Sequence, residues 1–133
     1  MNNLINKVAE NLNKNNMEAF VVESKEEVLP LLKSLLDDGA SVGVGGSVTL
    51  NEVGVLTFLR EGNYKFFDRY AEGLSRDEAV EVMRQSLLAD AFITSSNAVT
   101  EGGELYNVDG NGNRVAAFCF GPKKVIEIGR AHV

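Results

Sequence analysis

The sequence predicts an α/β fold: a mainly parallel sheet with helices on both faces. Short β-favouring runs alternate with stretches in which apolar residues recur at helical spacing. Three of the helical stretches open on a capping box, a serine or threonine followed three residues later by glutamate, at Ser24, Thr49 and Ser75. Strands that alternate with helices are joined by right-handed crossovers, which make the sheet parallel and cover both of its faces. A chain of 133 residues fits one such domain.

The first elements are a helix, a strand and a second helix. Apolar residues at helical spacing predict a helix across Leu4–Leu12, which ends in the polar run 13–16. Ala19–Val22 is short and β-favouring, and the capping box at Ser24 opens the next helix. Pro30 lies inside this helix and is expected to kink it, because proline has no backbone N–H to donate.

The same unit then recurs twice. A strand at Ala40–Val44 leads to a helix capped at Thr49, and a strand at Lys65–Asp68 leads to a helix capped at Ser75. The buried face of this last helix is expected to comprise Ala79, Val80, Val82, Met83, Leu87 and Leu88. Ala91–Thr94 is the fourth predicted strand.

The chain after the fourth strand is rich in glycine and asparagine, most of all over 107–113. It regains an apolar segment that ends in Lys124–Ile126, where a fifth strand forms. Parallel sheets bind ligands beyond the carboxyl ends of their strands. The loops 45–49, 69–75 and 95–112 are therefore the predicted location of a site.

Composition limits the classes of function. A net charge of −6, with both signs mixed along the chain, argues against nucleic-acid and acidic membrane surfaces as partners. The chain has no signal-peptide pattern and no apolar run of membrane-spanning length, so we expect a cytoplasmic protein. The single cysteine, Cys119, cannot by itself hold an iron–sulfur cluster or a structural zinc ion. We interpret it as an ordinary small apolar residue. No metal or cofactor is expected.

The carboxyl end predicts a foreign segment. Residues 128–133 can be encoded by ATC GGA AGA GCA CAC GTC, the start of a widely used sequencing adapter, and the preceding adapter bases fit a codon for Glu127. Residues 127–133 are therefore expected to be an artefact, with a domain over 1–126 that lacks its last elements. The single histidine, His132, would then be no part of the natural protein, and no catalysis or metal site is built on it.

The strand at Ala40–Val44 runs into a glycine-rich turn, with glycines at 43, 45 and 46 before the next helix. Backbone amides and a positive helix end converge there, while Ser47 and Thr49 can add hydroxyl donors, so the turn is typical of an anion site. It is neither a P-loop nor a dinucleotide fingerprint, because Gly-Lys-Ser/Thr is absent and Val48 stands where the third glycine would be. The alternative is a turn whose glycines only allow close packing of helix on strand.

Several segments resemble the LUD domain of the lactate-utilisation protein family, over about Leu4 to Ile126. The segments that carry the resemblance are Gly-Gly-Ser-Val-Thr-Leu at 45–50, Asp68-Arg69, Ala89-Asp90, Ser-Asn-Ala-Val-Thr at 96–100, Glu-Leu-Tyr-Asn-Val-Asp-Gly at 104–110, Gly-Asn-Arg-Val-Ala at 112–116 and Gly-Pro-Lys at 121–123. The resemblance implies the fold of ribose-5-phosphate isomerases, glucosamine-phosphate isomerases and coenzyme A transferases, in which the matching glycine turn of the isomerases holds a phosphate.

One departure from those isomerases bears on catalysis. Asn97 stands at the position most like their catalytic aspartate, and an amide cannot act as a general base. Glu104 and Asp109 remain as weak candidates for moving protons. The expected ligand-binding residues are Gly45, Gly46, Ser47, Thr49, Asp68, Arg69, Asn97, Asn107, Asp109, Asn113 and Arg114.

Two functions follow from the resemblance. The first is a cluster-free accessory or ligand-binding component of L-lactate oxidation to pyruvate, which binds a small carboxylate or phosphate and works with iron–sulfur subunits. The second is a standalone enzyme acting on a phosphorylated sugar or an acyl-coenzyme A, in which Arg69 or Arg114 holds a second anion.

Overall fold

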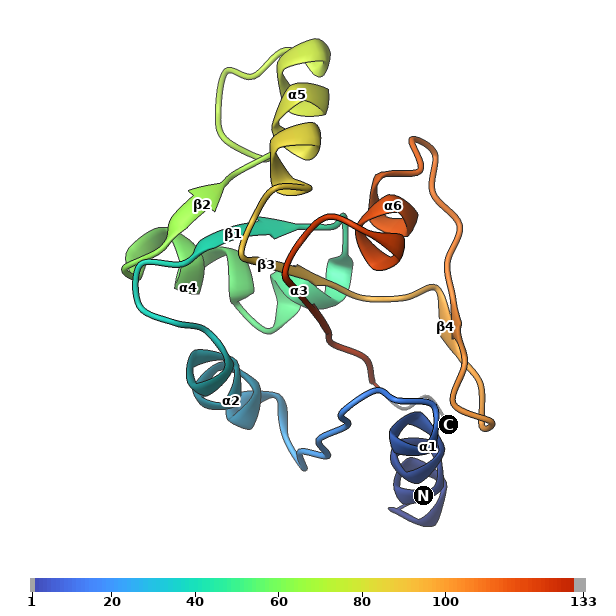
Figure 1. Ribbon diagram of the computed structural model, residues 1–133. Helices are drawn as coiled ribbons and strands as arrows, with labels where there is room; N and C mark the ends of the chain where they lie inside the picture. The colour runs from blue at the N-terminus through green and yellow to red at the C-terminus, as the bar shows by residue number, and fades with distance from the viewer. Residues whose placement is uncertain (1, 131–133) are drawn as a thin grey trace.

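The computed structural model describes residues 2–130, which form an α/β fold around a four-stranded parallel sheet (Figure 1). The strands are β1 (Ser41–Val44), β2 (Lys65–Phe67), β3 (Ala91–Thr94) and β6 (Lys124–Glu127), in the order β2-β1-β3-β6. All three neighbouring pairs are parallel. The predicted fold class is confirmed, and four of the five predicted strands are present.

Helices cover both faces of this sheet, as predicted. The helices α2 (Val28–Leu35), α3 (Val48–Glu52) and α4 (Val55–Glu61) lie on one face, and α5 (Arg76–Ser86) and α6 (Asn113–Cys119) lie on the other (Figure 1). The first face holds the main core, which joins Leu32, Leu36, Ala40, Val42, Val44, Leu50, Val55, Leu59, Ala91 and Ile93. Burial of these apolar side chains supplies most of the driving force for folding.

The order of the strands defines where a ligand can bind. From β1 the chain crosses to β2 on one side and then to β3 on the other, so the direction of winding changes between β1 and β3. At such a switch point the loops after the two strands diverge and leave a crevice at the carboxyl edge of the sheet. Here those loops begin at Gly45 and Ser95.

Three predicted elements near the amino terminus are corrected. Ala19–Val22 forms no strand, and Phe20 and Val21 are exposed. The segment has no neighbouring strand among the described residues, and β propensity alone does not make a ladder. Pro30 does not kink a helix, since it lies in the first turn of α2, where no N–H is needed. The capping box at Ser24 is confirmed, but it opens a short 3-10 helix, η1 (Lys25–Glu27), ahead of α2.

The helix predicted to be capped at Thr49 starts earlier and is divided. Ser47 is the N-cap residue of α3, and Thr49 is the second residue inside that helix. Gly54, with φ of 82°, separates α3 from α4, because a left-handed residue cannot continue a helix. The capping box at Ser75 is confirmed at the start of α5.

The region after β3 holds structure that the sequence did not reveal. Its first part is a hairpin of β4 (Ala98–Val99) and β5 (Leu105–Tyr106), and its second part is α6. Leu88, expected in a buried face, lies beyond the end of α5 and is 85% exposed. Cys119, in the last turn of α6, is also exposed.

The first helix, α1 (Asn2–Lys14), confirms the predicted amino-terminal helix and stands apart from the sheet, beside the tip of the hairpin (Figure 1). None of the helices within residues 2–130 is long and apolar enough to cross a membrane. Of the predicted foreign segment, residues 131–133, including His132, lie outside the described residues, and its origin stays a prediction.

Candidate functional site

The three glycines around the end of β1 have different roles. A side chain on Gly43 would place its Cβ 2.4 Å from Cβ of Ser86, so this glycine lets α5 pack against β1. On Gly45 the Cβ would lie 2.3 Å from Oγ1 of Thr94 in the neighbouring strand. Of these three glycines, only Gly46 is exposed. The packing alternative therefore explains the first two glycines, and the open point of the turn is Gly46.

Two side chains from the loop after β2 border Gly46. An added Cβ there would lie 3.4 Å from the Tyr70 hydroxyl and 3.5 Å from Nη1 of Arg69, which is ordinary contact distance. The Arg69 guanidinium lies over the Tyr70 ring, 5.2 Å from its centroid, an arrangement that favours the cation. None of the hydrogen bonds recorded among residues 2–130 uses this guanidinium, which is half-buried beside the turn.

Two serine hydroxyls meet at the switch point between β1 and β3. Ser95 Oγ donates to Ser47 Oγ at 2.7 Å, although 48 residues separate them in the chain. Ser47 Oγ also accepts from the N–H of Leu50 at 3.2 Å, as the N-cap of α3. These contacts fix both hydroxyls at the carboxyl edge of the sheet, and Ser47 directly follows Gly46 in the chain.

Asp68, a predicted ligand-binding residue, is occupied by another arginine. Its carboxylate accepts from Nε and Nη2 of Arg60 at 2.7 and 3.2 Å, and from the N–H of Tyr70 at 2.9 Å. Burial opposes the ionisation of Asp68, but these hydrogen bonds outweigh it and hold its pKa below the usual value. Asp68 thus shapes the loop that carries Arg69 and Tyr70.

Arg114 is the centre of a second, internal cluster. It is only 7% exposed and donates to the Asp109 carboxylate at 2.9 Å, to the carbonyls of Ser95 at 2.9 Å and Val108 at 3.1 Å, and to the Asn97 side-chain oxygen. Asp109 also accepts from the N–H of Val115 at 2.7 Å, in the first turn of α6. The pair therefore fastens the hairpin and α6 to the end of β3.

Two buried polar atoms lie at the ends of the hairpin. Among the described residues, Ser96 Oγ and Asn107 Oδ1 are buried without a hydrogen-bond partner. Asn97 accepts from the N–H of Val108 at 2.9 Å as well as from Arg114, so its side-chain oxygen is fully engaged. Of the predicted ligand-binding residues in this cluster, Asn107 is the one whose side-chain oxygen accepts no hydrogen bond.

The remaining predicted residues lie elsewhere. Glu104 is in the hairpin turn, where it accepts from the Thr100 hydroxyl at 3.1 Å, and the tip of that hairpin packs on α1. Asn113, the first residue of α6, lines a small cavity of about 170 Å³ between α5 and α6. Thr49 is half-buried inside α3. The structure thus gathers Gly46, Ser47 and Arg69 at one point.

Comparison with protein families identifies the domain. The model of the LUD domain matches residues 5–132, almost the whole chain. The chain belongs to the LUD-domain family. No curated protein and no solved structure matches it. The LUD-domain match covers both the glycine turn and the Arg114 cluster, and it confirms the resemblance inferred from the sequence motifs.

Sequence reasoning missed Tyr70 and Ser95 as individual residues, although both fall in the loops it singled out. The signal for Ser95 was its position directly after a predicted strand. Tyr70 had no comparable signal, because the approach of its hydroxyl to Gly46 depends on the folded position of its loop, in which its N–H donates to Asp68. Among the described residues, no group of three or more histidine, cysteine, aspartate or glutamate side chains could hold a metal ion.

Proposed function

We propose that this LUD domain is a ligand-binding component of L-lactate oxidation, which holds a small carboxylate at the crevice between β1 and β3. The observation that carries the proposal is the position of the Arg69 guanidinium beside the open backbone at Gly46. A guanidinium presents parallel donors that match the two oxygens of a carboxylate. The backbone at Gly46 has no side chain to keep such an anion away.

The two serine hydroxyls would complete the contacts to the ligand. Ser95 donates to Ser47, and Ser47 in turn has its own proton to donate. A ligand oxygen bound at this point would accept from Ser47 and from Arg69, and the Tyr70 hydroxyl lies on the same side of Gly46. Charge-assisted hydrogen bonds of this kind are about twice as strong as neutral ones.

Binding is better supported than turnover. A general base must reach the reacting proton, and the carboxylates near the site already have protein partners. Asp68 pairs with Arg60, Asp109 pairs with Arg114, and Glu127 accepts from the N–H of Ser96. Glu104 lies at the far end of the hairpin. We therefore propose an accessory role in which other subunits carry the iron–sulfur clusters, since the chain has a single cysteine.

A thermal-shift titration tests the binding proposal. Sodium L-lactate and sodium pyruvate should raise the melting temperature, because a ligand that binds only the folded state stabilises it. Arg69→Ala should abolish the shift, whereas Arg76→Ala, which removes an exposed arginine on α5, should preserve it. Equal shifts in both variants would remove Arg69 from the proposed site.

The second candidate, an enzyme acting on a phosphorylated sugar or an acyl-coenzyme A, rests on the same open turn. A phosphate can take the place of a carboxylate beside Arg69 and Gly46. Glucose 6-phosphate and acetyl-coenzyme A in the same titration separate the two functions. A shift with these compounds and none with lactate or pyruvate would favour the enzyme.

Association with iron–sulfur subunits needs a test of its own. The genes next to this one show whether such subunits are encoded together with it. Co-expression with those subunits, followed by affinity purification under anaerobic conditions, should recover a complex of fixed stoichiometry. Recovery of this chain alone would contradict the accessory role.

A further inference from the structure

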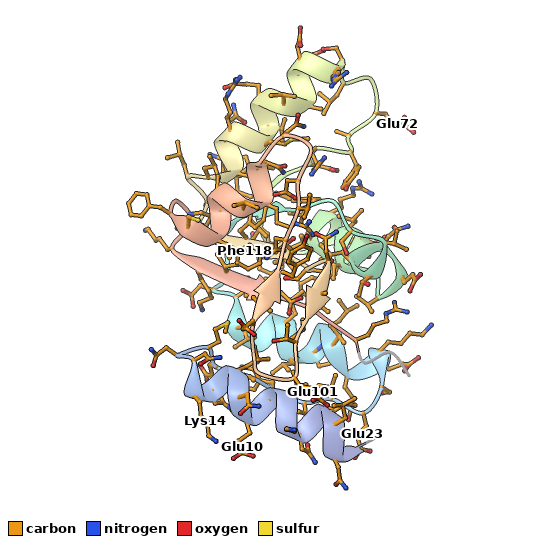
Figure 2. The ribbon with its side chains drawn as sticks, turned by 90° about the vertical axis from the view of Figure 1, so that its right-hand side faces the viewer. Glu10, Lys14, Glu23, Glu72, Glu101 and Phe118 are labelled. Atoms are coloured by element: carbon orange, nitrogen blue, oxygen red, sulfur yellow. The ribbon has the colours of Figure 1, made fainter. Side chains whose placement is uncertain are left out.

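The first helix is attached to the molecule mainly through the hairpin tip. Its apolar residues Leu4, Ile5, Val8 and Leu12 are exposed or half-buried, and among the described residues the buried core contains none from α1. Figure 2 shows Glu101, at the tip of the hairpin, beside the helix that carries Glu10 and Lys14. A helix that buries so little apolar surface is held weakly by packing.

Polar contacts make the attachment specific. The side-chain amide of Asn11 donates to the carbonyl of Glu101 at 2.7 Å, and that of Asn15 donates to the carbonyls of Gly102 and Gly103 at 3.0 and 2.9 Å. Gly103 has φ of 83°, and an added Cβ would lie 2.6 Å from the backbone carbon of Asn11. The tip therefore packs this closely against α1 only because residue 103 is a glycine.

The other end of the same hairpin is built into the candidate site. The N–H of Asn97 donates to the carbonyl of Tyr106 at 3.0 Å, and its side chain accepts from Arg114. Arg114 also holds the carbonyl of Ser95, whose hydroxyl donates to Ser47. A series of hydrogen bonds along the hairpin thus joins α1 to the carboxyl ends of β1 and β3.

We propose that α1 is a clasp that regulates ligand binding: when Asn11 and Asn15 hold the hairpin tip, the hairpin keeps Asn97 and Ser95 in the ligand-binding arrangement. This inference rests on the proposed function of that crevice. The docked state is held by three hydrogen bonds between side chains and carbonyls, each of modest net strength, and by an exposed ion pair of Lys7 with Glu101 at 3.8 Å, which adds little. By linkage, a ligand in the crevice must strengthen the docking of α1 as much as docking strengthens ligand binding.

Hydrogen–deuterium exchange without any ligand tests the mechanical connection. Asn11→Ala combined with Asn15→Ala removes all three hydrogen bonds, and exchange should rise about tenfold in residues 95–99 and 105–109 as well as at the tip. Asn6→Ala is the matched control, because Asn6 is an exposed asparagine of the same helix and none of the recorded hydrogen bonds uses its side chain. Faster exchange confined to α1 and residues 100–104 would overturn the proposal.

Gly103→Ala releases the tip from the opposite side of the contact, by steric conflict with the α1 backbone. It should reproduce the exchange pattern of the asparagine variant, while circular dichroism and exchange within β1 and β3 show that the sheet is intact. A Gly103→Ala protein with an intact sheet and unchanged exchange over 95–99 would also overturn the proposal.

Sodium L-lactate and sodium phosphate serve as probes for the regulatory step. Protection of residues 45–50 together with residues 2–14 supports the clasp, and the asparagine variant should then bind the probe about tenfold more weakly. Protection of 45–50 without 2–14 overturns the clasp but leaves the anion site in place. If neither probe protects residues 45–50 from exchange, the proposed function is overturned, and the regulation of binding with it. The experiment without ligand still decides whether α1 and the base of the hairpin are connected.

Discussion

Two polar regions meet at the carboxyl edge of the sheet and differ in how their hydrogen bonds are used. In the glycine turn, the exposed backbone at Gly46 faces Arg69 and Tyr70, whose polar groups border open space. In the region 95–114, Arg114 is buried and directs its donors at groups of the same region. The first region is therefore suited to bind a ligand, and the second holds the structure around it.

The difference shows that an arginine beside a polar loop is no evidence of ligand binding until its partners are known. Arg60, Arg69 and Arg114 all belong to or contact the loops that follow β2 and β3, and two of them are paired: Arg60 with Asp68 and Arg114 with Asp109. A buried arginine with satisfied donors stabilises its surroundings, whereas one without a protein partner can accept an anion.

The largest expected effect is that of Arg114→Ala. Removing one partner of a buried ion pair leaves the Asp109 carboxylate uncompensated, which should lower the free energy of unfolding by about 3–5 kcal/mol. Urea denaturation measures this loss. The matched variant Arg84→Ala removes an exposed arginine paired with Glu81 and should cost about 0.5 kcal/mol or less. Similar losses in the two variants would contradict the structural role of Arg114.

The two adjacent glycines of the turn should respond differently to substitution by alanine. Gly45→Ala forces a Cβ against the Thr94 hydroxyl and should cost about 1–3 kcal/mol of stability. Gly46→Ala meets only ordinary contacts, so it should leave stability nearly unchanged while it weakens the binding of lactate. Denaturation and ligand titration of both variants measure the two effects. Equal loss of stability would mean that Gly46 is also a packing residue.

The pH dependence of stability tests the pairing of Asp68. Its pKa is lowered in the folded state, because hydrogen bonds from Arg60 and Tyr70 outweigh the opposing effect of burial. Its contribution is therefore present above the ordinary aspartate pKa of about 3.9 and is lost as the pH falls through the lower folded value. Asp68→Asn should make the melting temperature less dependent on pH below about 4. An unchanged acid profile would contradict this pairing.

Glu127 should show a smaller effect of the opposite sign. It is largely buried, which raises its pKa although Ser96 donates to it at 3.0 Å and Arg114 lies nearby. Its charge thus disfavours the folded state, and stability falls as the pH rises from the ordinary glutamate value of about 4.3 through the raised folded value. Glu127→Gln should melt higher than the parent protein at pH 7.5 and no higher near pH 4, as followed by thermal melts. A lower melting temperature at pH 7.5 would show that the charge is stabilising.

Glu127 is also the first residue of the segment predicted to be foreign, and that origin stays a prediction. Glu127 pairs with Thr94 at the end of β6, and Ile128 packs against the core. Sequencing the source gene across this region decides the question. A reading frame that continues through Val133 to a natural stop codon would contradict the adapter origin.

Local sequence patterns predicted most of the sheet. Ser41–Val44 and Ala91–Thr94 are short apolar runs between turn residues, and burial on both faces makes such runs recognisable. Ala19–Val22 has the same local character and formed no strand, since its backbone has no strand to pair with. β propensity is a property of one segment, whereas a β-ladder forms only between two paired strands.

The hairpin after β3 could not be predicted from its own residues. Its two strands are only two residues long each, and their ends are held by Arg114 and by α1. Asn97 is a predicted ligand-binding residue, and that role stays a prediction. Its engagement by Arg114 depends on a residue in a helix that the sequence pattern did not reveal.

The sequence by itself determined the parallel sheet with its interleaved helices, because this follows from local propensities and from the handedness of chain crossovers. The edge of the sheet at which a site is expected follows from that fold. Tertiary structure alone decided which groups at that edge are open. Thr94 leaves no room for a side chain at Gly45, and Asp68 and Asp109 form ion pairs with Arg60 and Arg114. Gly46 stays exposed. Whether a polar group is satisfied depends on partners brought from distant parts of the chain, and no local pattern records them.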